Sequence, residues 1–177
     1  MKTLLLLRHG KSSWDNPGLE DFDRPLNERG VDDSKLMGKF ARRERIEPDL
    51  LVSSPATRAK STIELFSAAA GFKNATVYDE RIYEASARRL LQVISGLDDR
   101  LKSVLMVGHN PGFEELVERL TGEARKVPTA SLTCIELDID KWSAPKGGKG
   151  KLKWRMTAKK LRKEGFVGRT QSLRETA

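Results

Sequence analysis

The chain has 177 residues, of which 38% are hydrophobic and 33% are charged, and this suits a single globular domain with a sizeable core. No apolar stretch is long enough to span a membrane, and the N-terminal leucine run is shorter than the apolar region of a signal peptide. The single Cys134 excludes an intramolecular disulfide, and its apolar surroundings, LTCIEL, predict a buried thiol. We therefore expect a cytoplasmic protein.

The net charge of +8 belongs to the C-terminal end of the chain. Residues 141–177 contain twelve Lys and Arg against two Glu, whereas the other 140 residues contain 21 basic and 23 acidic ones. A basic segment can contact nucleic acid or another anionic partner, but this one lacks interleaved aromatic residues and zinc-finger spacing. The sequence therefore supports nucleic-acid binding only weakly and favours a solvated, partly disordered end.

Three segments share one pattern, in which an apolar β-rich run ends in polar residues and leads into a helical pattern. They are TLLLLRHG at the start, PDLLVSSPATRAKSTIELF with a strand near 49–53, and KSVLMVGHNPGFEELVERLTG with a strand near 103–108. The last predicts a helix with one apolar face, for which Asn110 would be the N-cap and Pro111 the first residue.

The remaining elements fit the same alternation of strands and helices. We expect a helix from near Asn27, a short strand in ATVYD, a helix in SARRLLQVISGL, and late strands in SLTCIELDIDKW and GKLKWRM. This order predicts an α/β fold, a three-layer sandwich whose central, mostly parallel sheet is flanked by helices.

Both histidines of the chain, His9 and His109, directly follow strand-like runs, and Arg8 and Arg58 occupy similar places. Ligands of open α/β sheets bind outside the carboxyl ends of the strands, so these four side chains are site candidates. Two guanidinium forks match a phosphoryl group, and a neutral imidazole can attack phosphorus to form a phosphohistidine. The set predicts phosphoryl transfer through a covalent phosphohistidine.

Two other kinds of site fit these residues poorly. A metal site would use the histidines as ligands, but Arg8 beside His9 opposes a cation, and no tight carboxylate cluster is spaced for one. The GKS at residues 10–12 would need a glycine at position 5 to be a P-loop, and that residue is Leu5. We therefore expect neither a metal ion nor another cofactor.

The motifs LLLLRHGKSS, SSPATRAKSTIELF and VGHNPG together resemble the histidine phosphatase superfamily, which is phosphoglycerate-mutase-like. RHGKSSW, YEAS and VGHNPGFEEL are most similar to its SixA-type phosphohistidine phosphatase branch. The similarity covers roughly residues 1–140 and implies a phosphoglycerate-mutase-like fold. It implies a histidine phosphatase domain at 1–155, followed by a basic extension at 156–177.

The resemblance also implies roles for single residues. His9 would be the phosphorylated nucleophile, and Arg8, Arg58 and His109 would bind the phosphoryl group. Gly10 would let the backbone come close, and the Ser12 hydroxyl would lie nearby. The DERIYEAS segment offers Glu80 as the proton donor and Glu84 as the reserve, although SixA-type phosphatases lack a clear acid.

Only about fifty residues separate Arg58 from His109, which leaves little chain for a lid, so we expect hydrolysis and not mutase chemistry. The expected partner is a phosphorylated protein bearing phosphohistidine or, as the alternative, a small phosphorylated metabolite. A non-catalytic binding protein led by the basic end is the third hypothesis. The oligomeric state stays open.

Overall fold

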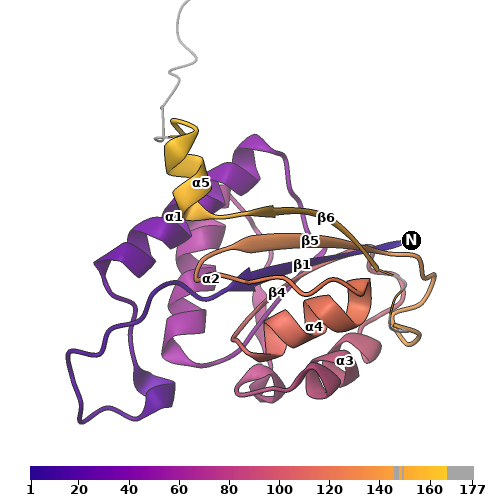
Figure 1. Cartoon of the computed structure of the whole chain (residues 1–177), viewed down its shortest axis with the longest axis horizontal. Helices are drawn as coiled ribbons and strands as arrows, with labels where there is room; N and C mark the ends of the chain where they lie inside the picture. Colours follow the sequence, from indigo (N-terminus) through magenta and orange to yellow (C-terminus); the bar gives the residue numbers. More distant parts are fainter. Residues whose placement is uncertain (146–147, 149, 167–177) are drawn as a thin grey trace, which may run out of the picture.

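Six strands form one sheet in the computed structural model, which describes residues 1–145, 148 and 150–166 (Figure 1). The strands are β1 (Lys2–Arg8), β2 (Leu50–Ser53), β3 (Thr76–Tyr78), β4 (Ser103–Gly108), β5 (Leu132–Leu137) and β6 (Gly150–Met156). Their spatial order is β3-β2-β4-β1-β5-β6. The first four strands of this order pair in parallel, whereas β5 pairs antiparallel with both of its neighbours.

Helices cover both faces of this sheet (Figure 1). They are α1 (Glu28–Arg43), α2 (Thr57–Ala70), α3 (Ala87–Ser95), α4 (Gly112–Thr121) and α5 (Ala158–Lys163), with short 3-10 helices η1 (Asp21–Asp23) and η2 (Glu80–Ile82). Residues of α1, α2 and α5 share one core cluster, and residues of α3 and α4 share the other. The predicted three-layer α/β sandwich with a mostly parallel sheet is confirmed.

The N-terminal leucine run is buried on both sides because strand side chains alternate between the two faces. Leu4 and Leu6 pack in the cluster of α3 and α4, whereas Leu5 and Leu7 pack in that of α1 and α2. All four side chains are almost fully buried, as the sequence predicts for a central strand of a covered sheet. Cys134 is a buried free thiol in β5, and burial raises its pKa to about 11.

Two helix starts were predicted from asparagines, and one prediction is wrong. The predicted start near Asn27 is confirmed, and the Asn27 side chain caps α1 by accepting a hydrogen bond from the Gly30 N–H. Asn110 does not cap α4, because its side-chain amide donates to the Val127 carbonyl instead. Pro111 takes the N-cap position of α4, without a side-chain cap.

The C-terminal part of the chain is described as far as residue 166. Strand β6 ends at Met156, one residue beyond the domain boundary predicted at 155, and α5 packs against α1. The division at 155 stays a prediction, and residues 167–177 of the basic extension lie outside the described residues. None of the helices within the described ranges combines the length and apolar content that a bilayer requires.

Gly38 is needed where α1 crosses α2, the helix that carries Arg58. A Cβ atom on Gly38 would lie 2.3 Å from the Phe66 carbonyl oxygen and 2.8 Å from the Ala69 side chain. Alanine favours a helix over glycine by about 1 kcal/mol, but overpacking a rigid contact costs about 1–3 kcal/mol. The overpacking cost is the larger effect because the clash involves backbone.

We therefore expect Gly38→Ala to lower the free energy of unfolding, measured by urea denaturation, by about 1–2 kcal/mol. Gly96→Ala is the matched control, because a Cβ there meets nothing closer than 3.6 Å. Equal stability of the two variants would contradict a tight contact between α1 and α2.

Candidate active site

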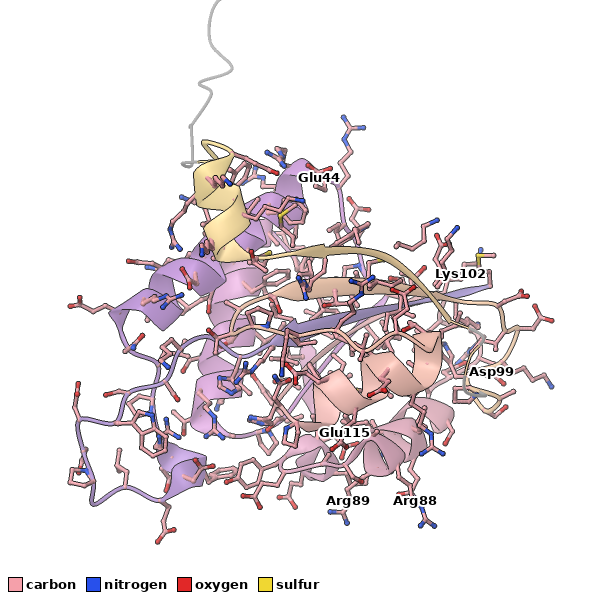
Figure 2. All side chains as sticks on the ribbon, in the orientation of Figure 1. Glu44, Arg88, Arg89, Asp99, Lys102 and Glu115 are labelled. Carbon is pink, nitrogen blue, oxygen red and sulfur yellow. The ribbon has the colours of Figure 1, made fainter. Side chains whose placement is uncertain are left out.

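Three neighbouring parallel strands end at the same edge of the sheet and bring the predicted site residues together. Arg8 pairs with Gly108 in the ladder of β1 and β4, so His9 and His109 emerge side by side. Their ring centroids are 5.1 Å apart, and each residue is 7% exposed. Strand β2 ends next to β4, and the chain turns from there into α2, whose first turn carries Arg58. Asp99 and Lys102, both labelled in Figure 2, precede β4 and therefore lie at the opposite end of these strands.

Each histidine ring is oriented by one hydrogen bond. The His9 Nδ1 lies 2.7 Å from the Gly10 carbonyl oxygen. The His109 Nε2 lies 2.7 Å from the Ser54 hydroxyl, while its Nδ1 is buried and makes no hydrogen bond to any described residue.

Both imidazoles are held in the neutral form. Burial, together with the nearby His109 and Arg58, lowers the pKa of His9 to about 3. Burial also lowers the pKa of His109 to about 3, with Arg58 adding to the effect and Asp21 opposing it. At neutral pH, therefore, each ring carries a single proton on one nitrogen, and the other ring nitrogen keeps its lone pair.

The two arginines are anchored differently. Arg8 donates from Nη1 to the Val127 carbonyl at 3.0 Å, and its buried Nε has no partner among the described residues. Burial lowers the pKa of Arg8, with the Glu114 carboxylate opposing that effect, yet an arginine remains charged. Arg58 donates to Asp21 twice, to the backbone oxygen at 2.7 Å and to the carboxylate at 3.0 Å.

Asp21 and Tyr83 belong to the site although the sequence did not single them out. The Tyr83 hydroxyl donates to the Asp21 carboxylate at 2.7 Å, and its ring lies edge-on to His109. The hydrogen bond from Tyr83 has the largest effect on Asp21, and together with the bonds from Arg58 and Arg24 it lowers the pKa of Asp21 to about 2. Burial and the neighbouring carboxylate raise the pKa of Tyr83 to about 12. These contacts join residues 37 and 62 positions apart, which no local pattern reveals.

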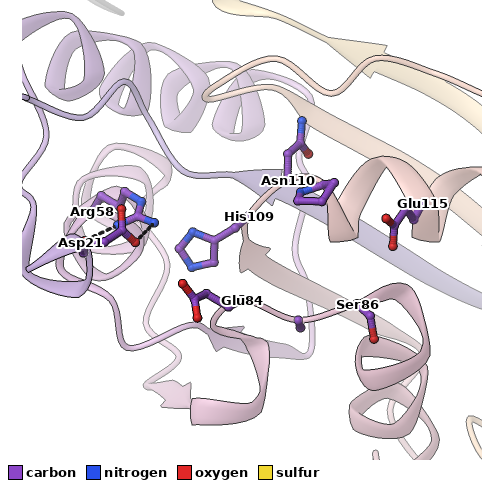
Figure 3. Close-up of a pocket in the computed structure, with 9 residues that line it drawn as sticks. Asp21, Arg58, Glu84, Ser86, His109, Asn110 and Glu115 are labelled. Carbon is purple, nitrogen blue, oxygen red and sulfur yellow. Dashed lines mark hydrogen bonds and ion pairs between the residues drawn. The ribbon is translucent and has the colours of Figure 1, made fainter.

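A cavity of about 530 Å³ opens beside His109 and Arg58 (Figure 3). Its lining residues are Asp21, Arg58, Glu84, Ala85, Ser86, His109, Asn110, Pro111 and Glu115. The lining thus combines the carboxylates of Asp21, Glu84 and Glu115 with the Arg58 guanidinium and the His109 imidazole. Glu84 has a left-handed backbone, with φ of 50°, which a non-glycine residue rarely adopts.

Five of the predicted site residues lie outside this lining. Two of them are Arg8 and His9, and the His9 ring lies 5.1 Å from the ring of His109, which does line the cavity. Glu80 begins η2 as an exposed residue. The buried Ser12 hydroxyl accepts a hydrogen bond from Arg24. Gly10 packs against α1, where a Cβ would lie 2.7 Å from the Gly30 carbonyl oxygen, so its small size is explained by this helix contact.

No group of three or more His, Cys, Asp or Glu side chains is arranged to hold a metal ion within the described ranges. The charged groups nearest the histidines are instead guanidinium groups, which are suited to anions. The arrangement offers two neutral imidazoles, two arginines and an open cavity, a set that can receive a phosphoryl group.

Comparison with known proteins agrees with this chemistry. Residues 4–87 match the family described as histidine phosphatase superfamily (branch 1). An uncharacterized chloroplastic protein of Arabidopsis thaliana is 29% identical over an aligned length of 181 residues, which covers 97% of this chain and 80% of that protein. The phosphohistidine phosphatase SixA of Escherichia coli is 26% identical over 158 residues, covering 87% of this chain and 92% of that protein.

A crystal structure from Agrobacterium tumefaciens, of a protein proposed to be a phosphohistidine phosphatase SixA, has the same fold. It superposes with a TM-score of 0.77 at 29% identity, covering 88% of this chain and 97% of that one. The family match over residues 4–87, these relatives and the shared fold lead to one conclusion: the chain is a phosphatase that is similar to the histidine phosphatase superfamily and, within it, to the SixA-type branch.

Proposed function

We propose that the protein is a metal-independent phosphatase that works through a covalent phosphohistidine on His9 and acts on phosphohistidine in a protein. The observation that carries this proposal is the state of the His9 ring. A carbonyl oxygen can only accept a hydrogen bond, so His9 must donate to Gly10 from Nδ1. Because the ring is neutral, its Nε2 keeps a free lone pair and is the nucleophile.

The reaction then has two displacements at phosphorus. The His9 Nε2 bonds to phosphorus as the bond from phosphorus to the leaving atom breaks, and the leaving atom takes up a proton. A water molecule then attacks the phosphorus, breaks the P–N bond, regenerates neutral His9 and releases inorganic phosphate. Arg8 and Arg58 neutralise the charge on the phosphoryl oxygens in both steps, a role that requires no metal ion.

His109 serves this proposal as a hydrogen-bond donor to the phosphoryl group. The Ser54 hydroxyl oxygen already accepts from the Ala56 N–H at 3.3 Å, so its own proton can be donated to the His109 Nε2. In that tautomer the His109 Nδ1 carries the ring proton. This buried Nδ1–H and the buried Arg8 Nε–H are then two donors without a described partner, beside the nucleophile.

The leaving group and the open cavity both support phosphohistidine as the substrate class. A protonated imidazole is a good leaving group, so phosphohistidine needs little help from an acid, and an open pocket can admit a protruding side chain. The cytoplasmic location stays a prediction, since the Arabidopsis relative is named as chloroplastic.

Small phosphate esters are the second candidate substrate, and Glu84 favours them. An alkoxide leaves only when an acid donates a proton to it, and a carboxyl group in the pocket can do so. Glu84 lines the cavity on the His109 side, whereas Glu80 does not line it (Figure 3). We therefore prefer Glu84 to Glu80 as the proton donor for esters.

Replacement of the nucleophile should abolish turnover. We expect His9→Ala to lose hydrolysis of an activated aryl phosphate by at least about 1,000-fold, and to lose the alkali-stable phosphoenzyme trapped by rapid quenching, because the variant lacks the imidazole that would bond to phosphorus. Excess EDTA should leave the wild-type rate unchanged. Lys11→Ala, a change at an exposed neighbouring residue, should keep both signals. Turnover by His9→Ala would refute the covalent mechanism.

The protonation state of the histidines can be measured directly. A free imidazole is almost fully protonated at pH 5, whereas pKa values of about 3 predict that His9 and His109 are both neutral there. The chain has only two histidines, so ring nitrogen NMR shifts across pH 4–8 report on this site alone. The unfolded chain binds more protons between pH 3 and 6.5, so stability should fall as the pH drops through this window. Protonation of either ring above pH 6 would contradict a neutral nucleophile.

The two candidate acids can be separated by substrate. We expect Glu84→Gln to slow an alkyl phosphate ester by about 100-fold and phosphohistidine by less than about threefold, since only the alkoxide needs the donated proton. Glu80→Gln is the matched control and should change neither rate. If Glu80→Gln alone slowed the ester, Glu80 would be the donor, and equal slowing of both substrates by Glu84→Gln would exclude an acid role.

A further inference from the structure

One loop of the chain lies over the edge of the sheet that carries the site. Residues 13–25, here called the strap, connect the end of β1 to α1 and contain η1 (Figure 1). The strap is closed at its base by the bridge between Ser12 and Leu26. On its inner side Asp21 binds Arg58 and Tyr83, so the strap is fixed to the rim of the cavity.

The outer side of the strap exposes apolar side chains. Six large hydrophobic residues of the described ranges are exposed, and three of them, Trp14, Leu19 and Phe22, lie within nine consecutive positions of the strap. Single exposed apolar residues are ordinary, whereas a group of them beside a pocket indicates an interaction surface. Phe22 also packs edge-on against Tyr83, which places this residue of the strap next to the site.

Trp14 is exposed yet held in place. It is 72% exposed, and the guanidinium carbon of Arg24 lies 3.3 Å from the centroid of its ring. Arg24 is itself buried, and it donates hydrogen bonds to Ser12, to the Ser13 carbonyl and to the Asp21 carboxylate. An aromatic ring held in this way loses little conformational freedom on binding, which is the property of an interface hot spot.

The charge of the strap specifies what it can bind. The strap contains four carboxylates against one basic residue, Arg24, which is buried and bonded to Asp21. Glu84 and Glu115 extend the negative charge around the cavity. Arg88 and Arg89, the nearest basic residues of α3, are exposed and point away from the body of the protein (Figure 2). Nucleic acid and anionic lipid are repelled by such a surface, whereas a basic protein segment is attracted.

We propose that the strap is the docking surface for the phosphorylated protein substrate, which would present an apolar side chain and Lys or Arg residues beside its phosphorylated residue. This inference rests on the proposed function. The arginines bind the phosphoryl group, Trp14 and Leu19 contact the apolar side chain, and Asp15 and Glu20 face the basic residues. The strap would thus distinguish a protein substrate from free phosphohistidine, which is too small to reach it.

The test compares two histidine-phosphorylated peptides, one with Leu and Lys flanking the histidine and one with each Lys replaced by Glu. We expect wild type to have a KM for the Lys peptide at least tenfold below that for the Glu peptide. Trp14→Ala and Leu19→Ala should raise the KM for the Lys peptide, by about tenfold for Trp14, and leave its kcat and the rate on free phosphohistidine unchanged. Asp15→Asn combined with Glu20→Gln, which retains side-chain size, should abolish the preference for the Lys peptide.

Val77→Ala, at an exposed apolar residue of β3 outside the strap, is the matched control and should change no constant. If it raised the KM as much as Trp14→Ala, or if the two peptides were equivalent for wild type, the docking proposal would be wrong. Unchanged melting temperatures of the variants exclude unfolding as the cause of any effect.

Binding without turnover separates this proposal from the proposed function. Fluorescence anisotropy of each labelled peptide on His9→Ala measures docking even if phosphohistidine is not a substrate. Selective binding of the Lys peptide that is weakened by Trp14→Ala would support docking, and absent hydrolysis by wild type would then count against the proposed function alone. The docking proposal would be wrong if Trp14→Ala left the affinity for the Lys peptide unchanged. It would also be wrong if an RNA oligonucleotide or an anionic vesicle bound more tightly than the Lys peptide.

Discussion

Burial of two imidazoles against two guanidinium groups is the constraint that organises this molecule. A charged histidine next to Arg8 and Arg58 would be costly in a dry environment, so both rings stay neutral, with pKa values of about 3. Neutrality removes the repulsion between the rings and the arginines, and it leaves a lone pair on His9. Burial therefore has two effects: it avoids charge repulsion within the folded protein, and it keeps His9 in the neutral form that can attack phosphorus.

The sheet supplies the rigid frame that this cluster requires. His9 and His109 are adjacent because β1 and β4 pair in parallel, in a register fixed along six residue pairs. The residue that follows the leucine run opposes a shift of this register, since moving β1 by one residue would bring Arg8 to the fully buried position of Leu7. Arg58 joins them from the first turn of α2, whose close packing on α1 depends on Gly38. Core packing thus determines where the phosphoryl group can bind.

Local patterns predicted the parallel strands and selected four side chains, those of Arg8, His9, Arg58 and His109. This was possible because an apolar strand and the polar residues at its end are consecutive in the sequence. The long-range contacts were not predictable in this way. Asp21 has no periodic neighbours, and only the folded chain brings it to Arg58 and Tyr83. The capping role expected for Asn110 failed for a related reason, since the Val127 carbonyl, seventeen residues away, competes for its side chain. Ranking Glu84 above Glu80 likewise required the backbone conformation, because both carboxylates lie in the same short segment.

Asp21 links the strap to the phosphate site without blocking it. A guanidinium has five N–H donors, and Arg58 uses one from each terminal nitrogen on Asp21, so three remain for a phosphoryl group. With a pKa of about 2, Asp21 stays ionised throughout the neutral range, so it remains an acceptor for Arg58, Arg24 and Tyr83. Its negative charge opposes the phosphoryl group, but Arg8, Arg24 and Arg58 outweigh it. The strap can therefore remain seated during catalysis, so that a partner bound on its outer side is held in a fixed position relative to Arg58.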